Sequence, residues 1–204
     1  MLDAKGHHPA SCAAGGDRTQ RHNALRDLVA EHAARAGLRP ELERPGVLLP
    51  QRPEDTHVAR RRPADIFLPT WVGGSPVALD FAITAPQRQE TLARAAEEDL
   101  AAAAAYAARK AAFEGTAEAC AAQGVRFCPM VAESTGAWEP EAERVLRRIS
   151  RTAAARNGTD PAAAWTLFQQ QTSVLLRRAR AQAELRRRDD PMAGGGPASP
   201  PAAQ

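Results

Sequence analysis

Two acidic residues, Asp65 and Asp80, each stand within a short apolar segment of this chain. Neighbouring carboxylates repel each other unless a cation lies between them, and oxygen ligands of this kind favour a hard divalent ion. Such an ion activates water and offsets the negative charge that develops during phosphodiester hydrolysis. If the two side chains meet, they predict a Mg²⁺ or Mn²⁺ site for that reaction. The spacing leaves the simpler interpretation open, in which both are solvated residues on an exposed face of a sheet.

A hairpin is the element that must bring the two acids together. Gly73-Gly74 is a hairpin turn signal between the apolar run Ala64–Leu68 and the alternating run Val77–Thr84. In the second run, Val77, Leu79, Phe81 and Ile83 share one face, and Ala78, Asp80, Ala82 and Thr84 share the other. The carboxylates could share one ion only if they lay within about 6–7 Å of each other, given ligand distances of roughly 2.0–2.6 Å.

The flanking segments predict an α/β domain over residues 19–156. An amphipathic helix from Thr19 ends at Gly37, a typical C-terminal cap residue, and Leu38–Glu43 follows as a short edge strand. After the hairpin, the patterns predict one alanine-rich helix over 87–113, a strand over 125–132 and a helix over 139–156. The order α-β-β-β-α-β-α predicts a small mixed sheet flanked by helices.

The two ends of the chain are expected to lie outside this domain. Asp160-Pro161 is an N-cap followed by proline at the first helical position, and it predicts an additional C-terminal helix within 157–188. Residues 189–204 are rich in proline, glycine and alanine and are expected to be disordered, and residues 1–18 are expected to be irregular.

The composition bounds the class of protein. The chain has 204 residues, a net charge of +3 and a pI of about 9.1, and its arginine-dominated basic bias suits phosphate contacts, although a high-GC genome would produce the same bias. Its three cysteines cannot all pair, and the N-terminus has no apolar run typical of a signal peptide, so we expect an intracellular protein. No stretch approaches about 18 bulky apolar residues, so we expect no membrane segment.

Several motifs together resemble a known family. Over roughly residues 6–150, the segments Arg21–Arg26, Arg62–Asp65, Leu79–Ala82 and Tyr106–Lys110 are similar to the PD-(D/E)XK restriction-like endonuclease domains associated with reverse transcriptases in site-specific non-LTR retrotransposons. The resemblance implies a restriction-endonuclease-like α-β-β-β-α-β core and a metal-dependent DNA endonuclease. It implies that Asp65 and Asp80 hold Mg²⁺ or Mn²⁺, and a nuclear location if the source is eukaryotic.

The lysine of that family is displaced here. The family pattern places it two residues after the second acid, where this chain has Ala82, but retroelement members carry it on the following helix. The resemblance therefore implies that Lys110 orients or activates the attacking water. Tyr106 stands four residues earlier and shares its helix face, and Glu98, further back, is a candidate third carboxylate. The alternative is that Lys110 and Glu98 are solvated and that Tyr106 fills the core.

Two further segments offer ligand-binding residues. His8 and Cys12 resemble the second half of a Cys-Cys-His-Cys zinc knuckle, but tetrahedral zinc needs four donors and the CxxC half is missing. We therefore expect Zn²⁺ only if that half lies upstream of a truncated chain; otherwise these two residues are unstructured. Arg60, Arg61 and Arg62 lead into the first acidic strand and are candidates for contacts with DNA phosphates, or simply a solvated loop.

Two other classes of function remain open at this point. The chain is either an active endonuclease, a catalytically inactive nucleic-acid-binding remnant of a retrotransposon protein, or a helical interaction protein in which the acids are incidental. The sequence leaves the oligomeric state open.

Overall fold

The computed structural model describes residues 16–49, 54, 58, 61–87 and 91–189, with the side chains of 187–189 excepted. His8, Cys12, Arg60 and the tail 190–204 lie outside the described residues, so the predictions made for them are not addressed by the structure. The described part contains the hairpin, both acids and all the predicted helices.

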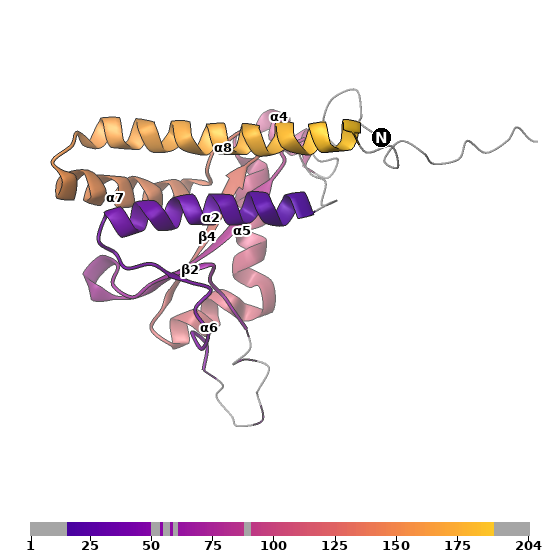
Figure 1. Cartoon of the computed structure of the whole chain (residues 1–204). Coiled ribbons are helices and arrows are strands. Elements are labelled where there is room, and N and C mark those ends of the chain that lie inside the picture. The colour runs from indigo at the N-terminus through magenta and orange to yellow at the C-terminus, as the bar shows by residue number, and fades with distance from the viewer. Residues whose placement is uncertain (1–15, 50–53, 55–57, 59–60, 88–90, 190–204) are drawn as a thin grey trace, which may run out of the picture.

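A four-stranded mixed sheet forms the centre of the molecule (Figure 1). Its strands are β1 (Glu41–Leu42), β2 (Ile66–Leu68), β3 (Val77–Thr84) and β4 (Arg126–Glu133), and they lie in that order. β1, β2 and β3 are antiparallel neighbours, whereas β3 and β4 run parallel. The prediction of an α/β protein with a small mixed sheet flanked by helices is confirmed.

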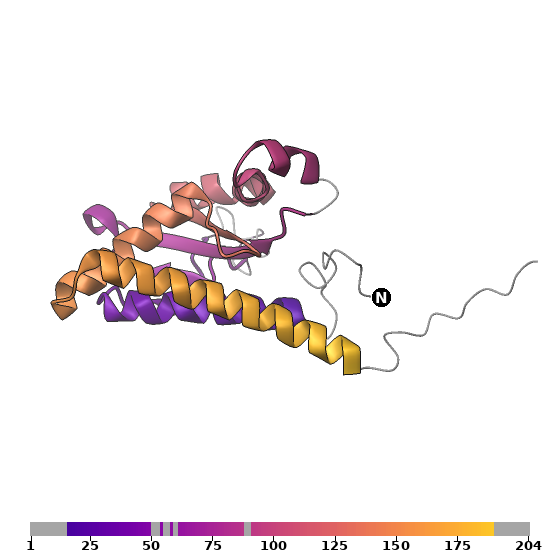
Figure 2. The ribbon, with the colours of Figure 1, turned by 90° about the horizontal axis from the view of Figure 1, so that it is seen from above.

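Three long helices cover one face of the sheet, and two of them, α2 and α8, lie side by side (Figures 1 and 2). They are α2 (Asp17–Arg35), α7 (Pro140–Asn157) and α8 (Pro161–Asp189). The main hydrophobic cluster joins Val77, Leu79 and Phe81 of β3 to Leu25 and Val29 of α2, Leu146 and Ile149 of α7, and Trp165 and Phe168 of α8. The C-terminal helix therefore contributes large side chains to the main core.

The opposite face carries shorter helices. These are α4 (Leu92–Glu97), α5 (Ala101–Ala112) and α6 (Thr116–Ala122), with short 3₁₀ segments at Val72–Gly74 (η2) and Phe113–Gly115 (η3). Ala78 of β3 packs against Cys120 of α6, and Ala82 packs against Ala103 of α5. The predicted alternation of β3, with one apolar face and one face of small residues, is confirmed.

The prediction of a single helix over 87–113 is wrong. The chain leaves the helical conformation at Glu98 (φ −132°, ψ 121°) and adopts a left-handed conformation at Leu100 (φ 62°) before α5 begins. Alanine favours a helix anywhere along this segment. Only Ala101, Ala102 and Ala103 are buried in α5, and α4 buries nothing, so packing against the sheet decides where the long helix starts.

The other helix ends follow local sequence signals. The Glu139 carboxylate accepts hydrogen bonds from the backbone N–H groups of Glu141 and Ala142 at 2.8 and 3.0 Å, and Asp160 accepts one from Ala163 at 2.7 Å. Gly37 adopts a φ of 77° just beyond α2, a conformation that glycine takes without strain. Of the helices in the described ranges, none has the length and apolar character needed to cross a membrane.

Candidate active site

The pairing of β2 with β3 brings the two acids close together. Ile66 pairs with Leu79, and Asp65, the residue just before β2, donates its backbone N–H to the Leu79 carbonyl at 3.0 Å, next to Asp80 on β3. Asp80 alternates along β3 with the core residues Leu79 and Phe81, so its side chain projects from the other face, on which α5 packs. Asp65 also contacts α2, the helix that packs on the main core, through His22.

The Asp65 carboxylate is held by two donors. Its Oδ2 accepts a hydrogen bond from the backbone N–H of Phe81 at 2.6 Å, and it lies 3.2 Å from Nε2 of His22 on α2. Burial raises the pKa of Asp65, but the hydrogen bonds from His22 and Phe81 outweigh it and leave that pKa below its ordinary value. The hydrogen bond to Asp65 raises the pKa of His22 in turn. Asp65 is therefore oriented and ionised at neutral pH.

Asp80 has a cationic partner. Lys110 Nζ on α5 donates to Asp80 Oδ2 at 2.6 Å, and the two side chains are only 20% and 24% exposed. Burial raises the pKa of Asp80 to about 6 although Lys110 lowers it, and Asp65 raises it further through its charge and a hydrogen bond. Asp65 and Asp80 therefore lie close enough for the Asp65 carboxylate to affect the pKa of Asp80.

His22 is the site residue that the sequence analysis did not identify. It belongs to the segment Arg21–Arg26 that carries the family resemblance, but no spacing rule links a position on α2 to Asp65, 43 residues later. The contact arises because α2 packs across the sheet beside the hairpin. A histidine on the polar side of an amphipathic helix is the only local signal, and it does not point to a particular partner.

Two predicted catalytic residues have other surroundings. Glu98 pairs with Arg94 at 3.0 Å and is 55% exposed, and the break before α5 interrupts the helical spacing that related it to Lys110, so its role as a third carboxylate stays a prediction. Tyr106 does lie on α5 with Lys110. The Arg109 guanidinium lies 4.5 Å from the centre of the Tyr106 ring, and Tyr106 packs against the cluster of Ala82, Ala103 and Val131.

The predicted phosphate-binding arginines border the acids. Arg61 is tied down, since it donates to Thr116 Oγ1 at 2.6 Å and lies 3.2 Å from Glu114, whereas Arg62 is 60% exposed and pairs with Glu43 at 3.0 Å. Both arginines line a cavity of about 330 Å³ that also contains Asp80 and Lys110. The remaining lining residues are Pro63, Phe113, Glu114 and Thr116. Asp80 therefore opens onto a pocket whose wall includes three basic side chains.

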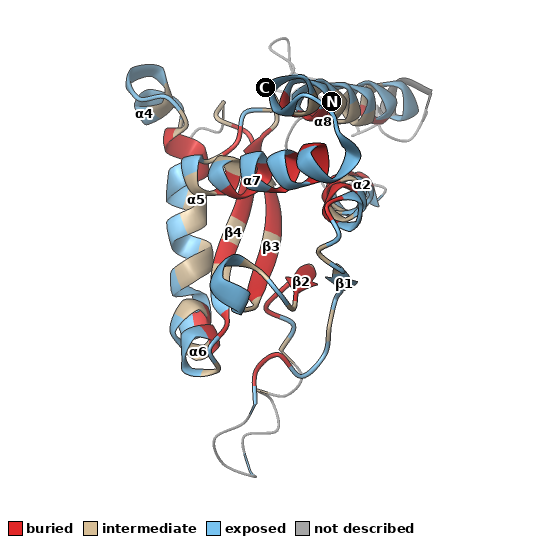
Figure 3. Cartoon of the chain, turned by 90° about the vertical axis from the view of Figure 1, so that its left-hand side faces the viewer, coloured by how far each residue is buried: buried red, intermediate tan, exposed pale blue. Residues whose placement is uncertain are grey.

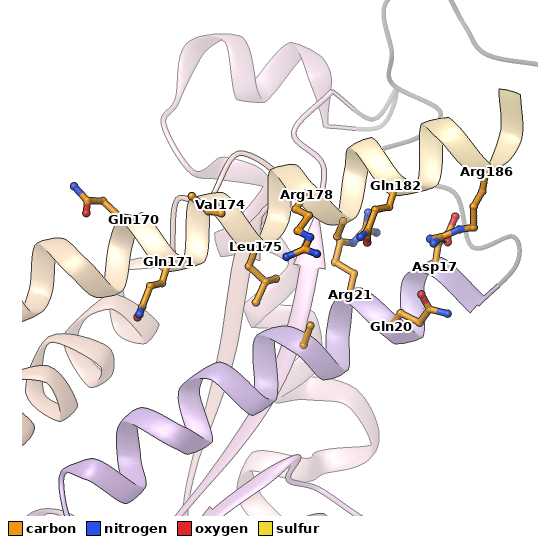
Figure 4. A pocket seen from close by; sticks show the side chains of 12 residues that line it. Asp17, Gln20, Arg21, Gln170, Gln171, Val174, Leu175, Arg178, Gln182 and Arg186 are labelled. Carbon is orange, nitrogen blue, oxygen red and sulfur yellow. Dashed lines mark hydrogen bonds and ion pairs between the residues drawn. The ribbon is translucent and has the colours of Figure 1, made fainter. Parts of the chain in front are cut away.

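A second cavity, of about 590 Å³, lies between α2 and α8 (Figure 4). Its wall combines apolar residues such as Val174 and Leu175 with polar side chains from both helices, among them Arg186, which pairs with Asp17. None of its lining residues is a predicted site residue. Of these two cavities, only the one beside Asp80 is lined by residues that the sequence analysis singled out as site residues.

The donor set suits a weakly coordinated hard cation. Within the described ranges, no group of three His, Cys, Asp or Glu side chains is arranged to hold a metal ion. Mg²⁺ commonly binds through one or two carboxylates and completes its shell with water and substrate phosphate. The pair of Asp65 and Asp80 meets that requirement, and a metal that needs a complete protein cage would not be held here.

The stability of the metal-free protein is expected to fall as the pH rises through about 6. Burial raises the pKa of Asp80 from 3.8 to about 6, so folding favours the protonated carboxyl. This contribution is fully present below the unfolded pKa and is lost as the pH passes the folded pKa, at a cost of about 3 kcal/mol. Urea unfolding in EDTA between pH 4 and 7.5 measures it, and Asp80→Asn should show a flatter profile. Equal slopes in both proteins would contradict the shift.

Two comparisons with known proteins give no match. No family model matches the chain, and a search of curated proteins finds no significant match.

Proposed function

We propose that this chain carries a metal-dependent DNA endonuclease domain of the PD-(D/E)XK type, derived from a retroelement. The observation that carries the proposal is the arrangement of Asp65 and Asp80 on adjacent antiparallel strands, with Lys110 Nζ 2.6 Å from Asp80. Two carboxylates and a lysine beside a cavity with arginine walls are the groups that phosphodiester hydrolysis needs.

The topology supports the same assignment. The chain runs through α2, three antiparallel strands, the α5 helix and a fourth strand parallel to the third, which is the α-β-β-β-α-β order of the family that the motifs resemble. The lysine that is absent at Ala82 has a substitute in Lys110, which reaches Asp80 from the helix that follows β3. Order of elements and placement of the lysine are independent of each other, so their agreement strengthens the proposal.

Asp65 and Asp80 are the residues that would hold Mg²⁺ or Mn²⁺. Bound there, the ion supplies positive charge to the phosphodiester and favours ionisation of water. The protein supplies the rest. The Phe81 N–H and His22 keep Asp65 in one orientation, and burial keeps both acids away from bulk water, where their charge would be screened.

Lys110 and the arginines act on the substrate in this proposal. Lys110 Nζ is positioned to hydrogen-bond a water beside Asp80 and to stabilise the negative charge that builds on the phosphate. Arg62, exposed at the mouth of the cavity and held only by an exposed ion pair, can exchange Glu43 for a phosphate oxygen at small cost. Arg61 is more firmly held and shapes the wall.

The test is metal-dependent cleavage by the whole chain. Mg²⁺ or Mn²⁺ should raise the thermal midpoint, since a ligand at 100 times its Kd stabilises by about 2.7 kcal/mol. Either ion should also support nicking of supercoiled plasmid, and EDTA should abolish both effects. DNA binding without cleavage in either metal would replace the proposal with an inactive nucleic-acid-binding remnant. Absence of a metal response and of salt-dependent DNA binding would favour the interaction-protein class.

A further inference from the structure

An arginine stripe runs along the outer face of α7, on the side of the sheet opposite Lys110. Arg144, Arg147, Arg148 and Arg151 follow one another at intervals of three, one and three residues, and all four are exposed. Such intervals place side chains on one helix face. Figure 3 shows this helix crossing β3 and β4 with its outer side exposed. The stripe is therefore a continuous surface feature.

The stripe borders a cavity of about 350 Å³. Its lining combines the four stripe arginines with Arg126 of β4, Glu141, Val145, and Trp71 and Val72 of the β2–β3 connection. Five arginines thus face one glutamate, although the whole chain has 27 basic and 24 acidic residues. The basic excess is concentrated here, and such a local field attracts polyanions.

The acidic partners of these arginines are few and only partly buried. Glu141 serves both Arg126 and Arg144, and Glu143 pairs with Arg147 at 2.6 Å. Arg148 and Arg151 have no carboxylate partner within the described part of the chain. Exposed ion pairs on a helix contribute little, so a phosphate oxygen can displace a carboxylate at small cost. The stripe is available to an anionic ligand.

Two aromatic rings hold the guanidinium groups in place. The Arg148 guanidinium lies 5.5 Å from the centre of the Trp71 ring, and that of Arg147 lies 4.6 Å from the centre of the Trp165 ring. An arginine stacked on a ring loses less side-chain entropy when it binds phosphate. The N–H fork of Arg148 has no carboxylate partner among the described residues, whereas that of Arg147 would have to exchange Glu143 for phosphate. The stacking thus orients part of the stripe in advance of binding.

The ligand must be extended. Arg144 and Arg151 are separated by roughly 10 Å along the helix axis, at 1.5 Å per residue, so one small anion cannot contact both ends. A phosphodiester backbone presents charges at regular intervals over such a length. We propose that the α7 arginine stripe, together with Arg126, is a second nucleic-acid-binding surface, which holds the phosphate backbone of a duplex apart from the pocket at Asp80. The choice of DNA as ligand rests on the proposed function.

The inference is tested by binding in EDTA, where cleavage does not intervene. Fluorescence anisotropy with a labelled 30-base-pair DNA duplex is recorded over a range of NaCl for the full chain and for the double variant Arg148→Gln, Arg151→Gln. Affinity should fall by about tenfold or more, and the slope of log K against log salt should decrease by about 2. The matched control is Arg177→Gln, Arg178→Gln, which removes the same charge from exposed positions on α8.

The outcomes separate the explanations. If both double variants lose the same affinity for DNA, the effect is due to net charge alone and the inference is overturned. Unchanged DNA affinity in the stripe variant would also overturn it. Should the stripe variant lose several degrees of thermal midpoint, Arg151→Glu alone replaces it, because Arg151 makes no aromatic or ion-pair contact with the residues that the structure describes. An RNA duplex of equal length, used as competitor, shows whether DNA or RNA is preferred.

The failure of this inference is distinguishable from that of the proposed function. If the chain binds duplex DNA through the stripe but does not nick plasmid, the second binding surface is supported and the endonuclease assignment is overturned. In the opposite case, the wild-type chain nicks plasmid and the stripe variant binds DNA as tightly as the wild type. That result would support the endonuclease assignment and overturn the second binding surface.

Discussion

Asp80→Asn is expected to lower the rate of Mg²⁺-dependent plasmid nicking by at least about 100-fold. The substitution keeps the shape of the side chain but removes one of the two negative charges that would hold the cation. It also takes from Lys110 the carboxylate to which it donates at 2.6 Å. The same variant should show a smaller rise in thermal midpoint with Mg²⁺, because it has lost one of the two carboxylates that would hold the ion.

The matched control for this experiment is Asp99→Asn. Asp99 is an exposed aspartate in the turn between α4 and α5, and it carries the same chemical change outside the pocket. It should nick at the wild-type rate and keep the metal response. Nicking by Asp80→Asn within about threefold of wild type would remove Asp80 from the catalytic machinery and, with it, the basis of the proposed function.

Lys110→Met is expected to separate catalysis from metal binding. Loss of the ammonium group should reduce nicking by about 10²–10⁴-fold, the range typical of a group that takes part in proton transfer or charge stabilisation. The two carboxylates remain, and they lose the cation that partly neutralises them. The rise in thermal midpoint with Mg²⁺ should therefore be retained or become larger, because the ion now relieves more repulsion between Asp65 and Asp80.

Arg109→Met is the control for Lys110→Met, since Arg109 is exposed on the same helix and its guanidinium rests on the Tyr106 ring. It should leave both nicking and the metal response unchanged. Two results would contradict the role given to Lys110: wild-type nicking by Lys110→Met, or loss of the metal response together with activity, which would indicate a collapsed site instead of a missing catalytic group.

The local parts of the site were predictable because their signals are local. The alternation in Val77–Thr84 places Asp80 on the face opposite Leu79, and Gly73-Gly74 provides the turn that makes β2 and β3 antiparallel. Helix ends marked by Gly37, Glu139 and Asp160 depend on hydrogen bonds within a few residues. Such features need no knowledge of the rest of the fold.

The break within the alanine-rich segment shows where local sequence signals no longer predict the structure. Alanine has no preference between one long helix and two short ones, so propensity alone extends the helix through Glu98. The burial of Ala101, Ala102 and Ala103 against the sheet sets the start of α5 and with it the direction from which Lys110 approaches Asp80. The helical spacing between Glu98 and Lys110 is interrupted for the same reason.

By itself, the sequence determined the strands, the faces on which their residues lie and most of the helix boundaries, because each depends on periodicity or on hydrogen bonds between near neighbours. Only the tertiary structure decided which side chains from distant elements join them. His22 reaches Asp65 and Lys110 reaches Asp80 because of where α2 and α5 pack along the strands of the sheet. That packing is set by the burial of many apolar side chains at once, which no short motif encodes.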